Sequence, residues 1–317
     1  MGMHTVVWGS NPFAYADLAD AFASFSIPRT VFWPYFTGFV LLAMGLFIIF
    51  KNDVPEAHGM DKLMPFGRLF YALPMAVFGT EHFVFDLVAL VPRWIPGHRF
   101  WVYFVGAALI SASLSIIVNR FSQLAATLLG IMILVFVLTI HIPHIVDSPG
   151  NRFFWAIGLR DVAFSGGAFA FAGTQSQLRS SSAPSLLVTL ARFFIALPCL
   201  FFGVEHFLHP QYLPGVPLDK RTPPWIPFPI LWSLLTGVVL LPAGVALVLK
   251  KNARLAATCL GLMILLLILF IYLPMVLSNP SSIGNDLNFF VDTLAFGGAA
   301  LLIANAMPGA GKDHSHV

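Results

Sequence analysis

Charged residues are scarce in this 317-residue chain. Lys, Arg, Asp and Glu make up 10% of it, whereas a soluble domain contains about 25%. Hydrophobic residues make up 58%, and apolar runs recur along the whole length. Runs of about 20 such residues cross a bilayer as α-helices. We therefore expect an all-α, multi-pass membrane protein whose main partner is the lipid bilayer.

Cysteines and clusters of cations are also few. The two cysteines, Cys199 and Cys259, lie in apolar runs and form no CxxC, so neither a disulfide framework nor a thiol redox motif is predicted. The largest groups of consecutive Lys or Arg residues are pairs such as Lys250-Lys251, which argues against a nucleic-acid partner. A basic region before a short apolar core is absent at the N-terminus, so we expect no cleavable signal. Phosphate-loop, nucleophile-elbow and zinc-protease motifs are absent too, so we do not expect the chain to be catalytic alone.

The sequence does contain a long internal repeat. Residues 67–83 (GRLFYALPMAVFGTEHF) and 191–207 (ARFFIALPCLFFGVEHF) are identical at ten of 17 positions. Beyond the first loop, the agreement continues at a constant offset of 131 residues, as in Asp161 and Asp292. Agreement this long and collinear indicates a duplicated unit of four helices.

The apolar runs and the repeat predict nine transmembrane helices, arranged as two tandem four-helix bundles plus one N-terminal helix. The expected helices are roughly 31–50, 68–90, 99–118, 122–142, 153–173, 188–208, 228–249, 254–276 and 287–305. The expected parts are an N-terminal extracytoplasmic segment (1–30), an extra helix and loop (31–66), a first repeat (67–173), a Ser-rich linker (174–187), a second repeat (188–306) and a cytoplasmic tail (307–317).

Two features near the N-terminus have more than one interpretation. Residues 14–25 are compatible with a short helix in the membrane interface and with a flexible tail. The extra helix shares Trp33, Thr37 and Gly38 with the second helices of the repeats. It is therefore either the remnant of a third unit or a chance match between apolar helices.

The distribution of cations predicts the orientation in the membrane. Of the 17 Lys and Arg residues, ten fall on one side of the expected helices and seven on the other. Because cytoplasmic loops carry more Lys and Arg, we expect the C-terminus in the cytoplasm and the N-terminus outside a bacterial inner membrane. Four helices separate the two copies, so the repeats are expected to be parallel and related by an axis along the membrane normal.

Ionisable residues inside the expected helices gather near the outer end of each repeat. The first repeat has Glu81, His82 and Asp161, and the second has Glu205, His206 and Asp292. Buried charges in lipid are costly and need partners, so we expect the three groups to approach one another within each bundle. The candidate pocket residues are Glu81, His82, Trp94, His141, His144, Arg160, Asp161, Glu205, His206, Trp225 and Asp292.

Several residues of the first repeat have no counterpart in the second. Val291 replaces Arg160 there, so we expect Arg160 to pair with Glu81 or Asp161 in the first bundle only. His141 and His144, with Glu81 and His82, offer up to four ligands for a zinc- or iron-type site, and facing histidines also suit haem. The alternative is that all these polar groups have a structural role only and join helices. No metal site is predicted.

The repeat resembles a known family. A four-helix unit that opens with Arg68 or Arg192 and ends its first helix in Gly-x-Glu-His-Phe is similar to the DoxX family of bacterial membrane proteins. The resemblance implies an inner-membrane protein associated with redox complexes, such as thiosulfate:quinone oxidoreduction, or with membrane-protein assembly. It supplies no catalytic residues. This chain departs from the family pattern because it has two units and an extra helix.

We accordingly expect a membrane subunit of a redox or quinone-linked system. It would bind a small lipophilic molecule, with quinone as the suggested cofactor, in an outward-facing polar pocket beside a redox partner protein. One alternative is a proton-coupled transporter or permeation protein that uses the Glu-His-Asp groups. Another is a structural assembly factor without catalysis.

Overall fold

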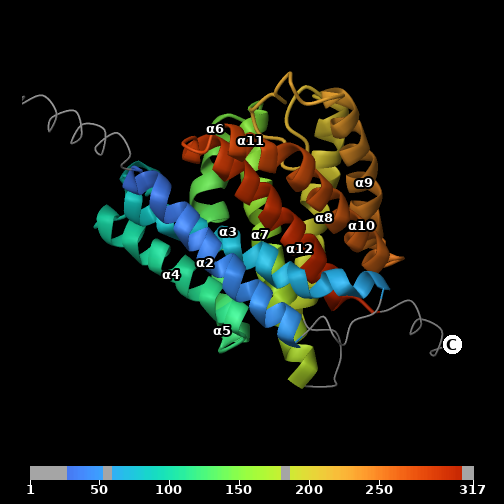
Figure 1. Ribbon diagram of the computed structural model, residues 1–317, viewed down its shortest axis with the longest axis horizontal. Coiled ribbons are helices and arrows are strands. Elements are labelled where there is room, and N and C mark those ends of the chain that lie inside the picture. The colour runs from blue at the N-terminus through green and yellow to red at the C-terminus, as the bar shows by residue number, and fades with distance from the viewer. Residues whose placement is uncertain (1–26, 53–58, 180–185, 309–317) are drawn as a thin grey trace, which may run out of the picture.

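The computed structural model describes residues 27–52, 59–179 and 186–308, and these residues form an all-helical protein (Figure 1). The interfacial helix expected over 14–25 lies outside the described residues, as does the tail beyond residue 308. The elements are α2 (Arg29–Asn52), η2 (Gly59–Leu63), α3 (Met64–Val84), η3 (Val88–Leu90), α4 (His98–Val118), α5 (Ser122–Phe136), η4 (Val137–His141), α6 (Ile142–Asp147), α7 (Arg152–Arg179), α8 (Leu186–Leu208), α9 (Pro229–Leu249), α10 (Ala253–Leu267), η5 (Ile268–Tyr272), α11 (Leu273–Ser278), η6 (Ile283–Leu287) and α12 (Asn288–Ala306).

Within residues 27–52, 59–179 and 186–308, seven helical segments are long and apolar enough to cross a membrane, as expected of a multi-pass membrane protein. They are α2, α4, the continuous segment from α5 to α6, α8, α9, the segment from α10 to α11, and the segment from η6 to α12. The helices α3 and α7 have 21 and 28 residues but fall outside this set. Glu81 in α3 and the Arg160-Asp161 pair in α7 make both helices more polar. The expected count of nine crossings therefore stays a prediction.

The third helix of each repeat contains a π-helical turn at the same place. In η4 the N–H of Ile142 bonds the carbonyl of Val137, and in η5 the N–H of Leu273 bonds that of Ile268. A proline, Pro143 or Pro274, is the second residue after each turn, and it has no N–H to continue the α-helical ladder, which favours the wider turn. The two repeats thus share this local irregularity of the helix backbone as well as their sequence.

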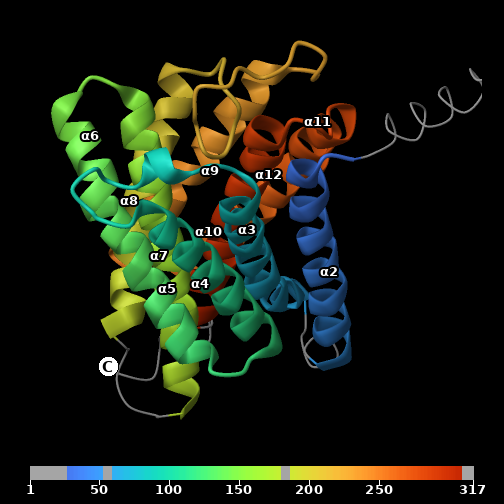
Figure 2. The ribbon, with the colours of Figure 1, turned by 90° about the vertical axis from the view of Figure 1, so that its left-hand side faces the viewer.

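The two repeats do not form separate bundles, which corrects the expected arrangement. The helix α3 packs on α12, and α8 packs on α7, so the first helix of each repeat packs on the fourth helix of the other. The order α3-α4-α5-α7-α8-α9-α10-α12 closes into a ring, and α7 also contacts α12 across its middle (Figures 1 and 2). We call the paired contacts of α3 with α12 and of α7 with α8 the interlock.

Glycines allow the helices of the interlock to approach closely. A Cβ added to Gly298 in α12 would overlap the backbone of Phe70 and Tyr71 in α3. A Cβ added to Gly166 in α7 would lie 2.9 Å from Cβ of Phe194 in α8. Small residues at helix crossings bring backbones together in membrane proteins. The glycines therefore allow the backbones of these helices to approach closely across the repeats.

The extra helix α2 packs outside the ring, against α3 and α4. It runs from the upper end of the molecule in Figure 2, where α6 and α11 also lie, to the lower end. Its origin as a remnant of a third repeat stays a prediction. The expected linker is shorter than 174–187, because α7 continues to Arg179 and α8 begins at Leu186.

We expect Gly298→Ala to destabilise the protein by about 1–3 kcal/mol, because the added methyl group overpacks a backbone contact of the interlock. The measurement is the unfolding midpoint in detergent. Gly284→Ala is the matched control, since a Cβ there meets nothing within 4 Å. Equal midpoints for the two variants would contradict the tight crossing of α3 and α12.

Candidate functional site

An arginine joins the two repeated aspartates at the contact of α7 with α12. Asp161 in α7 and Asp292 in α12 are both buried. Arg160 donates from Nε to Oδ1 of Asp161 at 2.9 Å and from Nη1 to both carboxylate oxygens of Asp292 at 3.0 Å. The expected pair of Arg160 with Asp161 is confirmed, but the restriction to the first bundle is wrong, because α7 and α12 lie side by side.

The repeat explains why this site contains an arginine from one copy only. Val291 occupies the position of Arg160 in the second repeat, so an approximate two-fold axis places positions 160 and 291 on opposite sides of the same contact. The guanidinium presents several N–H groups in a fixed plane. One arginine therefore serves both carboxylates.

His141 is a second hydrogen-bond partner of Asp161, beside Arg160. It stands at the end of the π-helical turn η4, and its Nε2 lies 2.8 Å from Oδ2 of Asp161. Tyr272 holds the equivalent place in η5, but its hydroxyl donates to the carbonyl of Pro214 at 2.7 Å. His144 lies apart from the cluster: it is exposed, and its Nδ1 lies 2.6 Å from the carbonyl of Ile140.

The two repeated glutamates meet different partners. Glu205 in α8 accepts from Nε of Arg152 at 2.8 Å, and Arg152 comes from the start of α7, in the other repeat. Glu81 in α3 faces α12, where its carboxyl group lies beside the side chain of Asn288 and within electrostatic range of Asp292. Each glutamate thus approaches the fourth helix of the other repeat, which corrects the expected approach within one bundle. The interlock is the reason.

The two repeated histidines point away from the central cluster. The Nδ1 atoms of His82 and His206 lie 2.8 and 2.5 Å from the carbonyl oxygens four residues earlier. The Nε2 of His206 also accepts from the backbone N–H of Gly215 at 2.9 Å. Neighbouring residues on an α-helix differ by about 100° in direction. Glu81 lies toward α12 and His82 toward Gly106 of α4, so the expected Glu-His-Asp triad does not form.

The remaining candidates do not close the cluster. Trp94 and Trp225 are 72% and 53% exposed in loops at the upper end, so they do not cover it. Within the described ranges, no three His, Cys, Asp or Glu side chains gather as metal ligands. The ligand set of Glu81, His82, His141 and His144 is accordingly not brought together.

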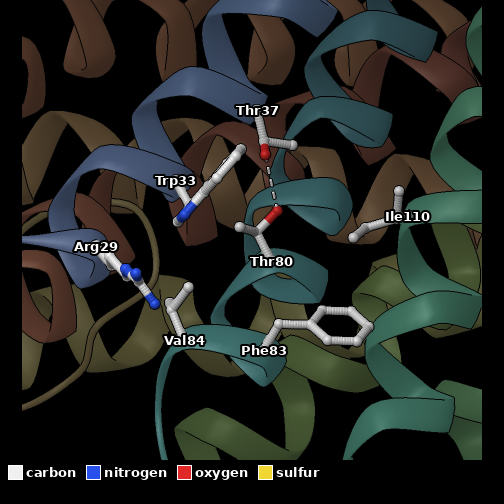
Figure 3. Close-up of a pocket in the computed structure, with 7 residues that line it drawn as sticks. All are labelled: Arg29, Trp33, Thr37, Thr80, Phe83, Val84 and Ile110. Atoms are coloured by element: carbon white, nitrogen blue, oxygen red, sulfur yellow. Dashed lines mark hydrogen bonds between the residues drawn. The ribbon is translucent and has the colours of Figure 1, made fainter.

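A cavity that the sequence did not indicate lies on the other side of α3. We call it the α2 groove. Its volume is about 550 Å³, and its lining residues are Arg29, Trp33, Thr37, Thr80, Phe83, Val84 and Ile110 (Figure 3). Thr80 Oγ1 lies 3.0 Å from Thr37 Oγ1 and also donates to the carbonyl of Ala76 at 2.9 Å. The groove exists because the extra helix packs beside α3 and α4.

Known proteins give no direct guide to this site. The chain matches no protein-family model, no curated protein and no solved structure. The resemblance to the DoxX family therefore remains an expectation drawn from the Gly-x-Glu-His-Phe motifs.

We expect Arg160→Val to destabilise the protein by several kcal/mol, because it leaves two buried carboxylates without their cation. The double variant Arg160→Val with Val291→Arg should recover much of that loss, since the axis places position 291 across the same pair. Unfolding midpoints in detergent measure both effects. A double variant less stable than Arg160→Val alone would contradict the symmetric arrangement.

Proposed function

We propose that this protein binds a small lipophilic molecule with a hydrogen-bond-accepting head, of the quinone kind, in the α2 groove. The observation that supports this proposal is the composition of the groove. Donors from Arg29 and Trp33 stand beside an apolar wall that includes Phe83 and Ile110. Small-molecule sites commonly combine apolar walls with a few polar groups in a cavity of about 300–1,000 Å³.

The groups of the groove suit carbonyl oxygens better than cations. Arg29 stands at the upper end of α2, where α2 begins, and its guanidinium offers only donors. The indole of Trp33 is 44% exposed and combines an apolar ring with one N–H donor. Lipid-facing sides of α2 and α4 leave room for an apolar tail. A quinone carries two carbonyl acceptors on an apolar ring and meets these demands.

This proposal changes the location that the sequence suggested. The outward-facing polar pocket was expected at the Glu-His-Asp groups, but Asp161, Asp292 and Glu205 are paired with arginines there. The groove lies on the opposite face of α3. The role as a membrane subunit that serves a redox partner, and the placement in a bacterial inner membrane, rest on the DoxX resemblance and the loop charges.

We expect a short-chain quinone such as ubiquinone-1 to raise the unfolding midpoint and to quench tryptophan fluorescence through Trp33. Arg29→Gln should weaken its binding by about 3–10-fold, the effect of one hydrogen bond. Fluorescence titration of the purified protein in detergent gives the dissociation constants.

Arg99→Gln is the matched control, because it removes an exposed arginine of the same end, outside the groove. If Arg29→Gln and Arg99→Gln bind ubiquinone-1 equally, the groove is not the site. If oleate competes as well as the quinone does, the groove recognises an anionic amphiphile and the quinone proposal fails.

A further inference from the structure

We propose that Glu81 and Asn288 form a proton-binding site between α3 and α12. The site is separate from the α2 groove, which lies on the other face of α3, and it stands on different observations. It concerns the one repeated carboxyl group for which the described residues provide no arginine.

The first observation is a pair of buried oxygens that lack a donor. Glu81 is only 7% exposed, and its Oε1 has no hydrogen-bond partner among the described residues. The side chain of Asn288 lies within hydrogen-bonding range of Glu81, and its Oδ1 is likewise buried without a described partner. Both atoms are acceptors when Glu81 is ionised, and buried acceptors without a donor are costly.

The second observation is the charge of the surroundings. From α12, Asp292 faces Glu81 at electrostatic range. From α7, Arg160 and Asp161 join the same cluster, and His141 bonds Asp161 from η4. On the far face of α3, Arg29 belongs to the groove and His82 bonds the carbonyl of Phe78. Arg160 is already shared between two carboxylates, so an ionised Glu81 would place a further negative charge near Asp292 without a cation of its own.

The third observation is the contrast with the second repeat. Glu205 stands at the equivalent place and pairs with Arg152 at 2.8 Å. The equivalent of Arg152 in the second repeat is Ile283, a buried apolar residue. The second repeat therefore has no cation at the position equivalent to the one from which Arg152 reaches Glu205. A proton on Glu81 Oε1 takes the place of that cation, because it removes the charge and makes the oxygen a donor to Asn288 Oδ1.

The position of Glu81 gives this proton a short route to one side of the membrane. Glu81 lies in the last turn of α3, which ends at Val84 near the upper end. The proton binds to and leaves the carboxyl oxygen, and no other bond changes.

Infrared spectroscopy of the full-length protein in detergent at neutral pH tests the site. A protonated carboxyl group has a C=O stretching band well separated from that of a carboxylate. We expect the wild type to show this band, Glu81→Gln to lose it and Glu205→Gln to keep it, since Glu205 is ionised against Arg152. Gln has the shape of Glu and retains a donor, so both variants should fold.

Two results would overturn the proposal. One is a wild-type spectrum without the band, or a band that persists in Glu81→Gln. The other is a sodium site: an unfolding midpoint that rises with NaCl but not with choline chloride, in the wild type and not in Glu81→Gln. Loss of quinone binding in the groove would leave the infrared result unchanged, so the two proposals fail separately.

Discussion

The structure depends on the bridge that Arg160 makes between Asp161 and Asp292. At the contact of α7 with α12 the two aspartates are buried and Arg160 is partly buried, so each charge needs a partner because neither water nor lipid stabilises it well. Since the two aspartates come from different repeats, the bridge can form only if the repeats share one interior. The interlock provides that arrangement and places each first helix against the fourth helix of the other repeat.

Duplication produced two halves that are alike in backbone and different in chemistry. The π-helical turns occur in both repeats. At equivalent positions, however, the second repeat has Tyr272 for His141, Val291 for Arg160 and Ile283 for Arg152. An arginine on an approximate two-fold axis satisfies both copies of a repeated acid, so its second copy is dispensable. The loss of the other arginine has a different effect, because Glu81 is left without a cation while Glu205 keeps one. The extra helix α2 adds a further difference, since it packs outside the ring against α3 and α4, where it forms the groove.

The sequence predicted the helices well and their partners poorly. Apolar runs and matched residues such as Asp161 and Asp292 were sufficient to locate the helices, the duplication and most of the polar cluster. An apolar helix face does not indicate which other apolar face it meets, so the interlock was not predictable from the pattern. Glu81 and His82 are adjacent in the sequence and suggested one site, although their side chains lie in different directions around the helix and contact different neighbours. Arg29 and Thr37 were missed because single polar residues in an apolar helix resemble ordinary interface residues.

The most direct test of the interlock is to cut the chain between its two repeats. A specific protease site inserted between residues 180 and 185, where α7 has ended and α8 has not begun, allows the purified protein to be cleaved in detergent. If the repeats share one interior, the two fragments will elute together in size-exclusion chromatography and unfold in a single transition. Fragments that separate, each with its own unfolding transition, would show two independent bundles and contradict the interlock.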